Sequence, residues 1–136
     1  MDIGRELKAN VGIAPDAYAA GTTNGGAVDT KGFHEALVIL NAGVAEATST
    51  LNVKVQESAN GSTGWADIAG AAFAEVTAAN DAAVYQGRVR ITASRKRYLR
   101  IVGVGATDAA DYGVAVILGD AVNKPAGAAN AFDIHG

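Results

Sequence analysis

The sequence of 136 residues contains no cysteine, which excludes disulfides, thiolate metal sites and thiol catalysis. Two prolines stand against 17 glycines, and this ratio indicates many tight turns rather than disordered linkers. The formal net charge at pH 7 is −3, too small to create a field that would draw the protein to nucleic acid or to a membrane surface. We therefore expect neither as a partner.

Long apolar runs are also missing. No stretch is long enough to cross a bilayer, and the segment that begins at Met1 lacks the apolar core of a secretory signal. We expect a protein that is made and assembled in the cytoplasm. A chain of this length suits one domain that can bury a real core.

The abundant residues favour strands. Valine and isoleucine together outnumber leucine by more than three to one, and β-branched side chains fit a pleated surface. Leu51–Gln56 alternates apolar and polar residues as a half-buried strand does, whereas Phe33–Leu40 is nearly continuous apolar sequence, typical of a buried strand. Further strands are expected at Trp65–Ile68, Phe73–Thr77, Tyr85–Thr92, Tyr98–Val104 and Tyr112–Leu118.

Turn signals separate these segments, and Asn60-Gly61 supplies the positive φ angles that tight hairpins need. The sequence predicts an all-β fold, a single antiparallel β-sandwich or jelly roll of about eight strands over residues 26–122. The side chains expected inside it are Val53, Val55, Val89, Ile91, Leu99, Ile101, Val114 and Val116.

The two ends of the chain carry little pattern. Residues 1–25 are expected to form a flexible, extended N-terminal arm, and residues 123–136 a C-terminal tail rich in alanine and glycine. We expect the arm to order on a partner; the alternative is an arm that is disordered in every state. The arm residues expected to contact the partner are Ile3, Arg5, Leu7, Lys8, Val11 and Ile13.

Cationic residues gather in one part of the chain, at Arg88, Arg90, Arg95, Lys96, Arg97 and Arg100. A hairpin of the two strands in this region would place Arg95, Lys96 and Arg97 at its tip and the other three arginines on one face. Three readings stay open: a solvated sheet face, a site for an acidic protein surface, and a site for nucleic-acid phosphates. Few aromatic residues stand nearby for base stacking, which argues against the third.

No residue pattern predicts catalysis or a cofactor, so we expect a protein that is not an enzyme. Gly103-Val104-Gly105 lacks the helix and the third glycine of a dinucleotide fingerprint and is interpreted as a bulge or a strand end. His34 and His135 show no metal-ligand spacing. We therefore expect neither a cofactor nor a metal.

Two further features have competing interpretations. Asp108, Asp111 and Asp120 would bind calcium if the fold gathered them, but aspartates in such loops commonly end strands by bonding to their own backbone. Trp65, the single tryptophan, is either a platform for a sugar ring or a plug at one end of the core.

One stretch resembles a known hairpin. Leu51–Ile68 reads LNVKVQESANGSTGWADI, and small structural proteins encoded beside tailed-phage capsid genes share a V-x-V-Q-E-S strand, a D/N-G-S/T turn and a W-x-D-I strand. Arg97–Ile101 and Gly113–Asp120 are similar to the closing strands of the same group. The resemblance covers roughly residues 33–122.

This resemblance implies a head decoration, or cement, protein of a tailed bacteriophage. Such a protein is a non-enzymatic part of the virion that sits on the capsid surface and stabilises it, so the expected partner is the major capsid protein of the same phage. The resemblance also implies a homotrimer. Because a fold does not fix a function, a phage neck or tail protein and a carbohydrate-binding β-sandwich module remain alternatives.

Overall fold

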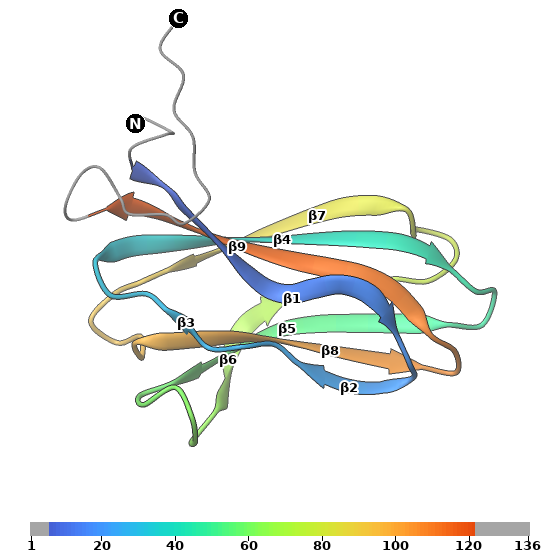
Figure 1. Cartoon of the computed structure of the whole chain (residues 1–136), viewed down its shortest axis with the longest axis horizontal. Coiled ribbons are helices and arrows are strands. Elements are labelled where there is room, and N and C mark those ends of the chain that lie inside the picture. The colour runs from blue at the N-terminus through green and yellow to red at the C-terminus, as the bar shows by residue number, and fades with distance from the viewer. Residues whose placement is uncertain (1–5, 122–136) are drawn as a thin grey trace, which may run out of the picture.

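The computed structural model describes residues 6–121; the expected C-terminal tail, residues 123–136, lies outside this part of the chain. The described residues form an antiparallel β-sandwich of two sheets (Figure 1), which confirms the predicted fold class. Its strands are β1 (Lys8–Tyr18), β2 (Gly21–Asn24), β3 (Val28–Asp29), β4 (Phe33–Ala45), β5 (Thr50–Ser58), β6 (Ala66–Ala72), β7 (Ala83–Arg90), β8 (Tyr98–Ala106) and β9 (Ala110–Ala121).

Strands that follow one another in the sequence mostly belong to different sheets. Sheet A has the order β1-β9-β4-β7, and sheet B has the order β2-β8-β5-β6, with the short β3 also paired to β8. Among the described strands, β5 and β6 are the only two consecutive ones that pair with each other. Most connections therefore carry the chain from one sheet to the other, which ties the two layers together.

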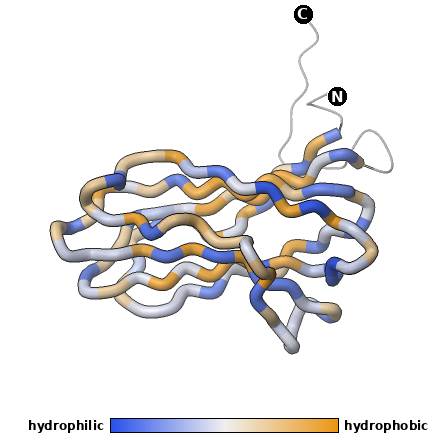
Figure 2. Tube along the Cα trace, turned by 180° about the vertical axis from the view of Figure 1, so that it is seen from behind, coloured by the Kyte–Doolittle hydropathy of each residue, from blue (hydrophilic) through white to orange (hydrophobic). Residues whose placement is uncertain are grey.

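The core lies between the sheets and follows the alternation of the sequence. On β4, for example, Ala36, Val38 and Leu40 are buried while the residues between them face outward. Hydrophobic and hydrophilic residues alternate along the strands in Figure 2. The predicted core is confirmed at Val53, Val55, Val89, Leu99, Ile101, Val114 and Val116, and the eighth member, Ile91, is partly buried against it.

The strand expected at Phe73–Thr77 is wrong. This segment is a connection that bonds to β5 at two points: Val76 and Leu51 exchange two backbone hydrogen bonds, at 2.8 and 2.9 Å, and Phe73 donates its N–H to the carbonyl of Val53 at 2.9 Å. Val76 is 2% exposed in the core and Phe73 is partly buried against it, whereas Ala74 and Glu75 between them are exposed. These two inward side chains give the segment the apolar and polar pattern of a strand.

The boundary expected at residue 25 is also wrong for the described part of the arm, because β1 pairs with β9 and β2 pairs with β8. Two glycines allow this close packing. A Cβ on Gly12 would lie 2.8 Å from Cγ1 of Ile101, and one on Gly25 would collide with the carbonyl oxygen of Gly12. Gly25 also donates its N–H to the carbonyl of Ile101 at 2.8 Å.

Candidate protein-binding surfaces

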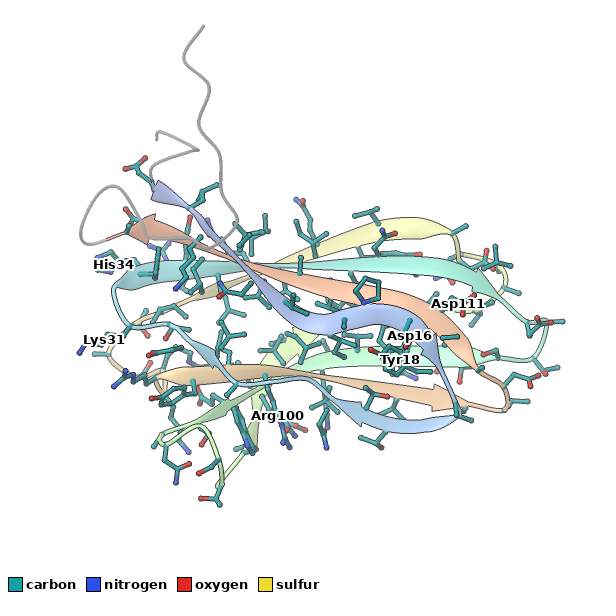
Figure 3. The ribbon with its side chains drawn as sticks, viewed as in Figure 1. Asp16, Tyr18, Lys31, His34, Arg100 and Asp111 are labelled. Carbon is teal, nitrogen blue, oxygen red and sulfur yellow. The ribbon has the colours of Figure 1, made fainter. Side chains whose placement is uncertain are left out.

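The first surface lies on the outward side of sheet B, where the hairpin of β5 and β6 meets β8. The guanidinium carbon of Arg100 lies 4.6 Å from the ring centroid of Trp65, which precedes β6. Arg100 Nε donates a hydrogen bond to Oε1 of Gln56 on β5, at 2.9 Å. Figure 3 shows Arg100 among the side chains of sheet B. Trp65 therefore stacks on an arginine at the surface instead of plugging the core.

A chain of polar contacts fixes this arrangement. Gln56 Nε2 donates to Oδ1 of Asp67 at 2.8 Å, and Lys54 Nζ lies 3.0 Å from the same oxygen. The hydrogen bond from Gln56, followed by that from Lys54, lowers the pKa of Asp67 below its ordinary value. Because Gln56 bonds to both Asp67 and Arg100, it holds the guanidinium over the Trp65 ring.

Tyr98 continues the surface at the start of β8. A Cβ on Gly61 would lie 3.0 Å from the Tyr98 ring, so the ring packs directly under the turn between β5 and β6. Gly61 has a φ of 77° there, as the Asn-Gly signal predicts. The guanidinium of Arg97 lies 5.0 Å from the centroid of the same ring. We call this group the Trp65 surface; its members are Gln56, Trp65, Asp67, Tyr98 and Arg100.

Arg95 and Arg97, two of the three cations expected at a hairpin tip, make side-chain contacts within the chain, and Lys96 makes one through its backbone. Arg97 donates two hydrogen bonds to Asp29, at 2.8 and 2.7 Å, and these bonds lower the pKa of Asp29 to about 2. The buried Glu57 accepts the Lys96 backbone N–H at 3.0 Å and lies 3.5 Å from Nε of Arg95. These contacts bind the β7–β8 connection to β3 and β5; contact with a partner stays a prediction.

The expected hairpin itself is wrong. β7 belongs to sheet A and β8 to sheet B, so Arg88 and Arg90 lie on one outer face of the sandwich and Arg100 on the other. Arg88 is 3.7 Å from Glu35 on the neighbouring β4. The sequence showed two amphipathic strands in succession, but the connection between them crosses from sheet to sheet, which no local pattern reveals.

The described arm residues that were predicted to contact a partner lie in different surroundings in the fold. Ile13 lies in the core at 3% exposure, whereas Val11, two residues earlier, is 65% exposed on the outer side of sheet A. The Leu7 side chain lies beside Gly119, and Lys8 begins β1 opposite Leu118. Ile3 and Arg5 lie outside the described residues. Ile13 is therefore a core residue, and its expected role as a partner contact is wrong.

The second surface is the outward side of sheet A, which we call the sheet A face. Its centre is apolar, formed by Leu37 and Ile39 of β4, Ala115 and Ile117 of β9, and Val11 of β1. A hollow of about 620 Å³ extends from this centre, and Val11, Ile39 and Ala115 are part of its lining. Asp16 and Asp111 also line the hollow, at the end of the sandwich seen in Figure 3.

The aspartates considered as alternative calcium ligands are not gathered by the fold. Asp111 lies near one end of β9 and Asp120 near the other, so the fold separates them. Within residues 6–121, no group of three or more His, Asp or Glu side chains is arranged to hold a metal ion. Figure 3 shows His34 at the end of the sandwich opposite Asp111; His135 lies outside the described residues.

Comparisons with known proteins do not assign this chain to a family. No protein-family model matches the sequence, and no curated protein is significantly similar to it. Across the described residues, no helix is long and apolar enough to cross a membrane.

Sequence reasoning missed two features of these surfaces. Gln56 and Asp67 stood inside the resembling hairpin but were not recognised as the pair that positions Arg100. The outward apolar residues Leu37, Ile39 and Ile117 lie in the predicted strands Phe33–Leu40 and Tyr112–Leu118, whose sequences are apolar on both faces. The uninterrupted apolar sequence of these strands was the signal for an apolar outer face. A strand at the surface of a sandwich does not require apolar residues on its outer side.

Proposed function

We propose that the protein is a non-enzymatic virion component that binds the outside of a phage capsid and stabilises it, and that the Trp65 surface is its docking site. The observation that carries this proposal is the composition of that surface. Tryptophan, tyrosine and arginine are the residue types most enriched where protein interfaces concentrate their binding energy. Here Trp65, Tyr98 and Arg100 lie together on the outward side of sheet B.

Three of the resembling segments also support the proposal, because they meet at this surface, whereas Gly113–Asp120 lies on β9 in sheet A. The V-x-V-Q-E-S strand contributes Gln56, the W-x-D-I strand contributes Trp65 and Asp67, and the later segment Arg97–Ile101 contributes Arg100. Segments apart in the sequence thus form one positioned group. The contacts between them keep the side chains in place before a partner arrives, which reduces the entropy lost on binding.

The carbohydrate-binding alternative fits this geometry less well. A sugar stacks on the open face of an aromatic ring, and the Arg100 guanidinium already covers one face of Trp65 at 4.6 Å. Retention of the protein on immobilised glycans that is lost in a Trp65→Ala variant would support that alternative.

The test is binding to empty shells assembled from the major capsid protein of the same genome, measured by co-sedimentation. We expect Trp65→Ala to weaken binding by about 2 kcal/mol or more, roughly 30-fold, as for a central interface residue. Arg100→Gln is expected to weaken it less, because Trp65 keeps its contact area. Glu46→Gln, a single charge change in the β4–β5 loop, is the control and should leave binding unchanged.

Circular dichroism and thermal unfolding of each variant check that the fold is retained. Equal binding of Trp65→Ala and the unchanged protein would exclude the Trp65 surface as the docking site. Failure of the unchanged protein to bind shells would contradict the capsid role; a position at the neck or tail in a virion map would favour that alternative.

A further inference from the structure

The sheet A face combines outward apolar side chains with a hollow whose lining residues are mostly apolar. Leu37 and Ile117 are directly paired neighbours and stand on one half of the face. The hollow of about 620 Å³ extends from Ile39 and Ala115 into the other half of the face, toward Asp16 and Asp111. A face with projecting apolar residues on one half and a hollow on the other can fit a second copy of itself.

The charged side chains of this face also separate into two groups, a basic one and an acidic one. Arg88 and Arg90 of β7 lie level with the start of β4, where Glu35 neutralises part of their charge. Asp16 and Asp111 lie at the opposite end, around the hollow. Positive charge at one corner and negative charge at the diagonal corner would attract each other between two copies related by a two-fold axis.

The strand register locates the point that lies halfway between the basic corner and the acidic corner. Arg90 pairs with Glu35, and the Cβ position of Gly43 lies 2.9 Å from Cβ of Asp111. Ile39 is halfway between residues 35 and 43 on β4, and it pairs with Ala115. A two-fold axis in the plane of the face and close to this pair would bring each basic corner onto the acidic corner of the other copy.

We propose that the sheet A face is the site at which two copies of this chain associate. Leu37 and Ile117 of each copy enter the hollow of the other, while Arg88 and Arg90 approach Asp16 and Asp111 across the axis. This inference is independent of the capsid role, because it uses the sheet opposite to the Trp65 surface.

The area of the sheet A face indicates how strongly two copies are expected to associate. Four strands about 4.8 Å apart, over about nine residues of about 3.3 Å each, cover roughly 600 Å². Specific interfaces typically bury about 800 Å² on each partner. We therefore expect a reversible dimer whose population rises with concentration.

Sedimentation equilibrium of the full chain over a wide range of concentrations tests the proposal. The expected mass rises from one copy to two. Ile117→Lys, at the centre of the face, should weaken association at least about tenfold, because an ammonium group would be buried without a partner. Val104→Lys is the matched control: Val104 is 37% exposed on the outer side of sheet B, and its substitution should leave the mass unchanged.

A charge exchange provides the sharper test. Arg90→Asp and Asp111→Arg each place like charges at both corners and should each weaken association at least about tenfold. An equimolar mixture of the two variants restores opposite charges at both corners and should recover the dimer. Because recovery requires folded chains, this result distinguishes a lost contact from a lost fold.

Several results would overturn the proposal. These are a one-copy mass at every concentration, an Ile117→Lys variant that associates normally, and a mixture that fails to recover. A three-copy mass would favour the homotrimer that the resemblance implies. A chain ending at Ala121 that associates when the full chain does not would show that residues 122–136 cover the face instead.

Discussion

At the scale of single residues, Asp29 and Arg97 give the fold a dependence on pH. The Asp29 pKa is lowered from 3.8 to about 2, first by its hydrogen bonds to Arg97. A carboxyl group with a lowered folded-state pKa stabilises the fold above its unfolded pKa, and this stabilisation is lost as the pH falls through the folded value. The effect is small, because the two side chains are 44% and 46% exposed and solvent screens them.

We expect Asp29→Asn to lower the free energy of unfolding by a small, constant amount above about pH 5, with the difference shrinking between about pH 4 and pH 2. Urea denaturation at several pH values measures it. Asp108→Asn, in the β8–β9 turn, is the control. A difference from the unchanged protein that persists in full at pH 2 would contradict the assignment.

At the scale of elements, the docking of β1 and β2 depends on a close approach of two glycines. A Cβ on Gly25 would collide with the carbonyl oxygen of Gly12, whereas one on Gly26 would meet no atom within 4 Å. We expect Gly25→Ala to destabilise the fold by about 1–3 kcal/mol, as overpacking does. Gly26→Ala should change stability by no more than about 0.5 kcal/mol. Chemical denaturation compares them, and equal stabilities would refute the close approach.

At the scale of the whole molecule, the interleaved sheets predict cooperative unfolding. Most connections cross between sheets A and B, so neither sheet keeps its strands when the other opens. Trp65 fluorescence reports on sheet B, and far-ultraviolet circular dichroism reports on all strands. We expect the two signals to give the same denaturant midpoint, as two-state unfolding requires. A fluorescence midpoint clearly below the dichroism midpoint would mean that sheet B unfolds first.

The sequence alone determined the fold class and nearly all of the expected core. Residues such as Val53 and Val55 alternate with polar neighbours, and a strand places alternate side chains on opposite faces whatever its pairing. The Asn60-Gly61 turn was equally accessible, because φ preference is local. These inferences succeeded because each depends on a few adjacent residues.

Only the tertiary structure decided which strands pair and which residues meet. It placed β7 and β8 in different sheets, brought the first strands of the chain into the sandwich, and set Arg100 over Trp65. It also left the apolar Ile39 on an outer face. Pairing depends on chain crossings and contacts between residues far apart in sequence, and a period of two says which side chains share a face but not what that face meets.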